Sequence, residues 1–126
     1  MKYVAGLKKE PAFVPIVSNF YSGMVVSIPI FKEQLSPGIG LKEIKKLFSE
    51  KYTGPIVKYT ENLGEEGYLS AAMMSGKDSM QVSVLGNEDR ILLVSRFDNL
   101  GKGASGAAVQ CMNLILGENE TYGLNL

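Results

Sequence analysis

Histidine is absent from this 126-residue sequence. A chain without it has no imidazole general base, no serine–histidine–aspartate arrangement and no histidine ligand for a metal ion. The single cysteine, Cys111, excludes an internal disulfide and a thiolate zinc site. One cysteine also fits a protein of the reducing cytoplasm. The sequence therefore offers no catalytic residue and no metal site of these kinds.

Net charge is lacking as well, because 13 lysines and arginines balance 13 acidic residues. Nucleic acids and anionic membranes both attract proteins through positive charge, so neither is an expected partner. The chain has no apolar run of membrane-spanning length, and no signal peptide is expected. Its hydrophobic fraction of 45% is ordinary for one soluble globular domain.

Hydrophobic periodicity predicts both strands and helices. Alternating residues in 24–31 indicate a strand, and Pro29 favours an edge position for it because proline lacks an N–H. The stripe of Leu41, Ile44, Leu47 and Phe48 predicts an amphipathic helix over 41–51, lying on a sheet. Further strands are expected over 56–60, 80–85 and 90–96, the last two joined as a hairpin, and a second helix over 102–116 ending at Gly117.

This order predicts an α+β fold with an antiparallel or mixed sheet and helices on one face. Four segments carry weaker signals. They are a short connector over 2–10, a polar loop over 61–67 in which Glu65 and Glu66 are solvated, an ambiguous stretch over 69–79, and a polar tail over 118–126.

The densest cluster of unusual residues follows the strand 91–95. Gly101, Gly103 and Gly106 match the spacing GxGxxG between a strand and a helix, which in a dinucleotide-binding fold cradles a pyrophosphate. That motif must open a βαβ unit with an acidic residue on the next strand, and here no such strand follows. The alternative is that glycine and alanine let the helix pack tightly against the sheet.

The helix after this turn is apolar on two sides. One side consists of Ala104, Ala107, Ala108, Cys111 and Ile115, and the other consists of Val109, Met112 and Leu116. Such a helix is expected to be buried on both sides, one of them against a partner, and Cys111 then acts as a small buried hydrophobe.

The run Phe97–Gly106, with 108–110 and 113–114, resembles the C-terminal signature of the N-acetyl-gamma-glutamyl-phosphate reductases, in the semialdehyde dehydrogenase superfamily. The resemblance continues in order over nearly the whole chain. Near the start it includes 11–15, 19–20 and 23–24, and after the helix it includes Gly117, 120–121 and 123–124. Among these reductases, the sequence resembles the shorter subfamily best.

The resemblance implies an NADP-dependent enzyme of arginine biosynthesis that reduces an acyl phosphate to a semialdehyde through a cysteine thioester. Such enzymes have an N-terminal Rossmann domain and a catalytic α+β domain that also forms the dimer. Their nucleophile and acid–base segments, of the His-Pro-Gly-Cys and His-x-Pro-Glu types, have no counterpart here and would precede Met1.

The chain is therefore expected to be a partial catalytic and dimerisation domain over 1–126 that is inert alone and forms a homodimer through its sheet. Residues 102–117 would return to the missing Rossmann domain. The alternative is a non-catalytic dimerisation or binding module derived from the same domain.

The resemblance further implies that Asp98 and Asn99 contact the nicotinamide of NADP in the full-length enzyme. The glycines Gly101, Gly103 and Gly106 would permit that approach, and Asn113 would face the cofactor side. For Asp98 the alternative is a helix N-terminal cap. For Lys102 we prefer the interpretation that its charge is solvated and has no functional role. Tight NADP binding by this chain alone is not expected.

Overall fold

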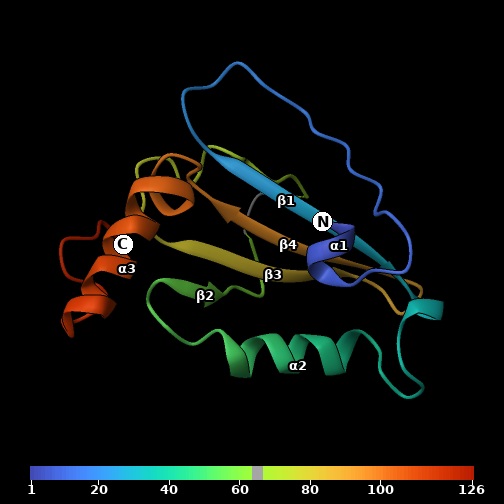
Figure 1. The fold of residues 1–126 in the computed structure, drawn as a ribbon. Helices are drawn as coiled ribbons and strands as arrows, with labels where there is room; N and C mark the ends of the chain where they lie inside the picture. Colours follow the sequence, from blue (N-terminus) through green and yellow to red (C-terminus); the bar gives the residue numbers. More distant parts are fainter. Residues whose placement is uncertain (64–66) are drawn as a thin grey trace.

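The computed structural model describes residues 1–63 and 67–126. Four strands form one sheet in the order β1-β4-β3-β2 (Figure 1). Their bounds are β1 Met24–Phe31, β2 Val57–Tyr59, β3 Met80–Gly86 and β4 Arg90–Phe97. The pairs β1/β4 and β3/β4 are antiparallel, whereas β2 runs parallel to β3. The predicted α+β fold with a mixed sheet is confirmed.

The predicted hairpin and edge strand are both present. β3 and β4 pair from Met80 with Phe97 to Gly86 with Ile91. The Asn87 side-chain oxygen accepts main-chain hydrogen bonds within the turn between them. β1 lies at the edge of the sheet and contains Pro29, whose missing N–H is tolerated best on an edge strand.

Helix α2, Leu41–Lys51, has the predicted bounds. It begins where the Glu43 carboxylate accepts the Gly40 N–H at 2.9 Å, half of a capping box. Its buried residue Ile44 packs with Val84 and Ile91 of the sheet, and six half-buried side chains surround that cluster: Ile30, Leu35, Leu41, Phe48, Tyr59 and Leu93. Leu47, expected on the same stripe, is 62% exposed because it lies at the margin of the contact.

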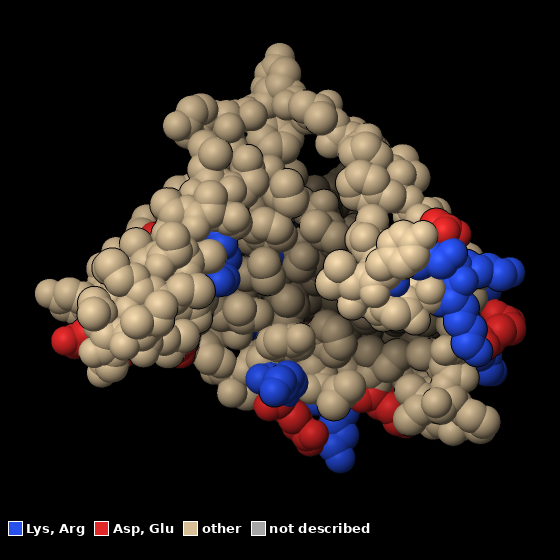
Figure 2. Space-filling model, viewed as in Figure 1, with Lys and Arg blue, Asp and Glu red and all other residues tan. Residues whose placement is uncertain are grey.

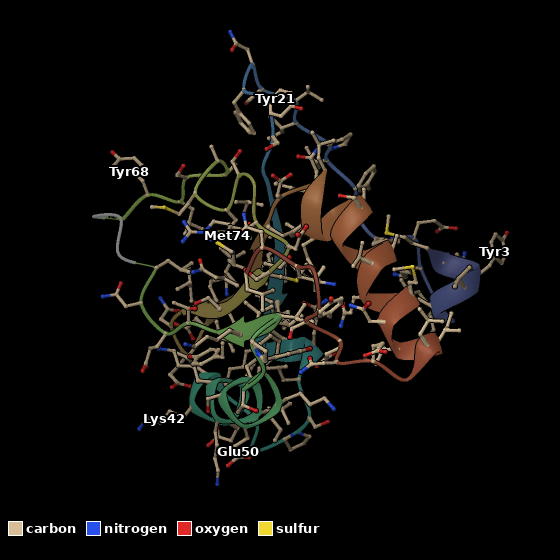
Figure 3. All side chains as sticks on the ribbon, turned by 90° about the vertical axis from the view of Figure 1, so that its left-hand side faces the viewer. Tyr3, Tyr21, Lys42, Glu50, Tyr68 and Met74 are labelled. Atoms are coloured by element: carbon tan, nitrogen blue, oxygen red, sulfur yellow. The ribbon has the colours of Figure 1, made fainter. Side chains whose placement is uncertain are left out.

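The two faces of the sheet are covered differently. Helices α1 and α3 stand on one side, and the segment before β3, with Tyr68 and Met74, lies on the other (Figure 3). On β4, Arg96 is buried, and its guanidinium donates to Gln81 Oε1 at 2.7 and 3.1 Å. No described helix is long and apolar enough to cross a membrane.

The N-terminal part differs from its sequence expectation. The connector contains a short helix, α1, Lys2–Ala5, which ends at Gly6 with φ +64°. A single turn of 3₁₀ helix, η1, Lys32–Gln34, follows β1. Between α1 and β1, residues 11–21 arch away from the sheet (Figure 1). We call this segment the arm; its Val17 is 95% exposed.

The last helix begins with a π-helical turn, η2, Gly101–Ser105, and continues as α3, Gly106–Leu116. Gly117 ends it in the left-handed conformation at φ +74°, as predicted. The expectation that Cys111 is buried is wrong, because it is exposed on α3 and no residue of 1–63 or 67–126 covers it. The predicted loop residues Glu65 and Glu66 lie outside the described residues.

Candidate functional site

Asp98 follows β4 directly and is 2% exposed. One carboxylate oxygen accepts the N–H groups of Leu100, at 2.7 Å, and Gly101, at 3.2 Å. The other accepts the Ser22 hydroxyl at 2.8 Å and the Gly76 N–H. The first pair caps the turn that opens the last helix, as the cap alternative describes. The second pair ties the turn to two distant loops, so all these acceptor positions serve the protein itself.

The charge of Asp98 is stabilised by these contacts. Burial raises the pKa of the Asp98 carboxyl, whereas its four hydrogen bonds lower that pKa by more, so it lies below its ordinary value. The carboxylate thus remains ionised at neutral pH. Ser22 also shares a hydrogen bond of 2.7 Å with Ser75. Since the Ser22 proton points to Asp98, the Ser75 hydroxyl is the donor to Ser22.

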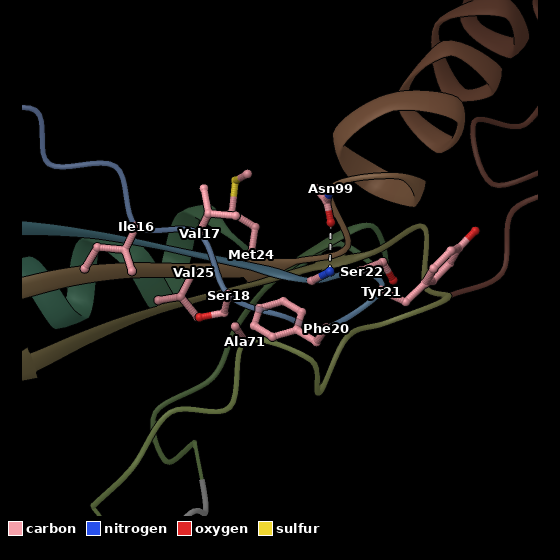
Figure 4. A pocket seen from close by; sticks show the side chains of 11 residues that line it. Ile16, Val17, Ser18, Phe20, Tyr21, Ser22, Met24, Val25, Ala71 and Asn99 are labelled. Carbon is pink, nitrogen blue, oxygen red and sulfur yellow. Dashed lines mark hydrogen bonds between the residues drawn. The ribbon is translucent and has the colours of Figure 1, made fainter.

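Asn99 connects the turn to the start of β1. Its Oδ1 accepts the Gly23 N–H at 2.8 Å, drawn as the dashed line in Figure 4. Gly23 has φ +129°, and a Cβ there would collide with the carbonyl of Ala71. Only glycine fits this position without strain. The Nδ2 donor of Asn99 has no hydrogen-bond partner among residues 1–63 and 67–126.

The glycines of the turn allow a close approach of the protein's own chain. A Cβ on Gly101 would lie 2.5 Å from the carbonyl oxygen of Lys77, and one on Gly106 would overlap the Asp78 carboxylate. A Cβ on Gly103 would meet the turn itself, at 3.2 Å from the Phe97 ring. Loop 76–78 therefore occupies the space that Gly101 and Gly106 open, as tight internal packing requires.

Asn113, the sixth candidate, lies two turns further along α3 and is buried. Its Nδ2 donates to the carbonyl oxygens of Glu120, at 3.3 Å, and Tyr122, at 2.8 Å. It thus holds the polar tail rather than joining Asp98 and Asn99. Lys102, expected to be solvated, is half-buried and donates to Gln110 Oε1 at 2.9 Å.

A cavity of about 400 Å³ lies between the arm and the start of β1 (Figure 4). Its wall is mostly apolar, with Val17, Phe20 and Met24, and its polar groups include the Ser18 hydroxyl and Asn99. Apolar walls with a few polar groups are typical of small-ligand sites. A second cavity of about 300 Å³ adjoins it and is lined by Ser75, Asp78 and Asp98.

The described residues contain no cluster of three or more acidic or cysteine side chains that could hold a metal ion. Residues 1–99 match the family model described as semialdehyde dehydrogenase, dimerisation domain. The chain belongs to this family.

Curated relatives agree with the family assignment. The N-acetyl-gamma-glutamyl-phosphate reductases of Brucella ovis, Brucella canis and Brucella abortus are each 41% identical to this chain over 117 residues. The match covers 89% of this chain but 38% of each relative. This semialdehyde dehydrogenase dimerisation domain thus spans well under half the length of these relatives, and the resemblance seen in the sequence is confirmed.

Sequence reasoning missed the residues that hold the site of this semialdehyde dehydrogenase domain together. Ser22, Gly76 and Asp78 contact the turn, and Ser75 is hydrogen-bonded to Ser22, yet all four belong to segments without a motif. Asp98, Asn99 and Gly101 line the two adjoining cavities, whereas Gly103 and Gly106 pack within the turn and against Asp78. Of these residues, Ser22 alone adjoins a stretch that carries the family resemblance, 23–24.

Proposed function

We propose that this chain is the C-terminal part of an NADP-dependent N-acetyl-gamma-glutamyl-phosphate reductase of arginine biosynthesis, acting in the cytoplasm. The reaction reduces an acyl phosphate to a semialdehyde. The observation that carries the proposal is the identity of 41% to reductases of that name over 89% of this chain. The aligned share of 38% of those relatives supports a further, N-terminal nucleotide-binding domain in the complete enzyme.

The cofactor fits this chain only in part. The cavity of about 400 Å³ is too small for a whole dinucleotide, so this domain would meet one end of it. The Nδ2 of Asn99 is the donor that would hold the nicotinamide carboxamide, with the Ser18 hydroxyl as a second polar group. When bound, NADPH supplies the hydride. Asp98 and the glycines would shape the turn, and Asp98 keeps its charge for that purpose.

The chain alone is proposed to be inert. It contains no histidine to act as acid or base, and Cys111 is on the exposed side of α3 rather than in either cavity. Loss of a nucleophile or base costs several orders of magnitude in rate.

The experiment has two arms. The first assays the 126-residue chain for phosphate-dependent NADP⁺ reduction with the N-acetylated glutamate semialdehyde, and no turnover is expected. Turnover near that of an ordinary enzyme, about ten per second, would contradict inertness. The second arm reads the encoding DNA upstream of Met1. An in-frame His-x-Pro-Glu segment is expected, and its absence would contradict the reductase assignment.

The proposal includes a homodimer through the sheet, in keeping with the family description. On β1, Met24, Val26 and Ile28 alternate along the strand and all remain exposed. Figure 2 shows a hollow in the face that carries α1 and α3, with charged residues gathered mainly at its lower and right-hand margins. Burial of such an apolar surface against a second copy would be favourable.

A non-catalytic dimerisation module is the second candidate function. It is favoured by the family model itself, which describes a dimerisation domain and covers residues 1–99 but not α3. The upstream DNA separates the two candidates, because a module would lack both the histidine segment and the nucleotide-binding domain.

A further inference from the structure

The last residues of the chain hold the loop that packs against the glycine turn. The Asn125 N–H donates to Asp78 Oδ2 at 3.0 Å, and its carbonyl accepts the Asp78 N–H at 2.7 Å. The Asn125 Nδ2 donates to the Gly76 carbonyl at 2.7 Å. Lys77 Nζ donates to Asn125 Oδ1 at 3.4 Å and to the Leu126 carbonyl at 2.7 Å. Asn125 therefore contacts three consecutive loop residues, with both its main chain and its side chain.

The other side of loop 76–78 faces the turn. The Gly76 N–H donates to the Asp98 carboxylate, and the Lys77 carbonyl accepts the Lys102 N–H at 3.3 Å. The loop is thus a single layer between the tail and the turn. A displacement of the loop would remove a donor from Asp98 and open the space beside Gly101.

The turn that loop 76–78 contacts is π-helical. Its bonds run from Gly103 N to Asp98 O and from Ser105 N to Leu100 O, each spanning five residues. Such π-helical turns are rare and are frequently found at functional sites. Loop 76–78 adds hydrogen bonds to this turn from outside the helix.

We propose that Asn125 is a positioning residue for the turn Asp98–Gly106. It acts through loop 76–78 and need not touch a ligand itself. Asn125 itself is exposed. The effect of Asn125 on cofactor binding rests on the proposed function, whereas the effect of Asn125 on the turn does not.

The test is amide hydrogen exchange, measured by NMR on the 126-residue chain without any ligand. Asn125→Ala removes the side-chain bonds and keeps the main-chain bonds to the loop. One hydrogen bond contributes a roughly two- to tenfold change in a local equilibrium. We therefore expect the amides of Gly103 and Ser105 to exchange about five- to twentyfold faster, while the central amides of β3 and β4 keep their rates.

Asn119→Ala is the matched control. Asn119 is an exposed asparagine of the same tail, and within the described part of the chain its Oδ1 accepts only from Thr121, at 3.0 and 2.8 Å. It should leave exchange in the turn unchanged. Asn125→Asp is a second variant that keeps the Lys77 contact and loses the donor to Gly76. It should loosen the turn as Asn125→Ala does.

Two results would overturn the proposal. In the first, exchange in the turn stays at the parent rate in both Asn125 variants. In the second, it rises equally in the turn and in β3 and β4, which is general destabilisation rather than positioning. Neither result bears on the reductase assignment, which the upstream DNA tests separately.

Discussion

The side-chain oxygen of Asn99 accepts the main-chain N–H of Gly23 at 2.8 Å, across 76 positions of the sequence. The preceding residue, Asp98, accepts the hydroxyl of Ser22 over the same separation. Two neighbours at the exit of β4 thus hold two neighbours at the entry of β1. These two bonds fix the point where the arm joins β1, next to the cavity lined by Gly23 and Asn99.

Gly23→Ala is expected to lower the free energy of unfolding by about 2–4 kcal/mol. The new methyl group would combine a strained φ with a collision against the Ala71 carbonyl. Urea denaturation measures the change. Gly38→Ala is the control, because Gly38 has φ +82° with open space around it and should cost about 1 kcal/mol. Equal losses in the two variants would contradict the collision.

Asp98→Asn is expected to cost about 2–4 kcal/mol of unfolding free energy at neutral pH, because an amide nitrogen would face donors that now meet a carboxylate oxygen. Urea denaturation of the variant and the parent measures this cost. Asp89→Asn, at the exposed hairpin turn, makes the same charge change and should be nearly neutral.

The free energy of unfolding of the parent protein should also depend on pH in the acidic range. The pKa of Asp98 is lowered in the folded state from its ordinary value of 3.8. Its contribution is therefore complete above that value and is lost as the pH falls below it, through the folded-state pKa. Urea midpoints from neutral pH to about pH 2.5 should show a component of acid destabilisation that Asp98→Asn lacks. An identical pH dependence in the two proteins would exclude Asp98 as its source.

Ile44→Ala should destabilise the chain by about 2–5 kcal/mol, because it leaves a cavity between α2 and the sheet. Leu47→Ala on the same helix should cost less than about 1 kcal/mol, since Leu47 is 62% exposed. Thermal or urea unfolding of the pair measures the difference. Similar costs would mean that α2 does not pack through Ile44.

Ile28→Lys is expected to weaken self-association while the fold is kept. Ile28 is 53% exposed on the edge strand, and a charge there would be desolvated in a sheet-mediated dimer. Sedimentation over a range of concentrations should show a dimer for the parent and a shift to monomer for the variant. Leu47→Lys, on α2, is the control and should remain dimeric. A monomeric parent would contradict the dimer itself.

Cys111 should react with a maleimide in the native chain about as fast as in the urea-unfolded chain, because it is exposed on α3. Mass spectrometry would detect one adduct, and Cys111→Ser should give none. Strong protection in the native chain would show that a second copy covers this side of α3.

The sequence predicted the elements whose signals are local. The bounds of α2 followed from the stripe through Ile44 and Phe48, and the β3–β4 hairpin from two apolar runs around 86–89. The short helix α1 was missed because four residues are too few for a periodic pattern. The parallel pairing of β2 with β3 depends on a connection that no motif marks.

Only the turn of the candidate site was predictable from the sequence. The turn residues Asp98 and Asn99 stood out in the sequence, but their partners Ser22 and Gly23 come from a segment 76 positions away. The tail, residues 118–126, also carried only weak signals of order in the sequence. It is held by hydrogen bonds to Asn113 and to loop 76–78 rather than by its own composition. Long-range hydrogen bonds leave no periodicity in a sequence, so neither contact had a local signature.

No charged residue occurs from Pro11 to Phe31, a stretch that includes the arm and the whole edge strand β1. Proteins usually protect an edge strand with lysines, bulges or prolines, and here Pro29 alone interrupts it. During synthesis β1 is made before its pairing partner β4, which follows almost sixty residues later, since Phe31 pairs with Arg90. In that interval an uncharged strand is free to pair with other chains. Overexpression is therefore expected to favour inclusion bodies unless the chain is made slowly or in the cold.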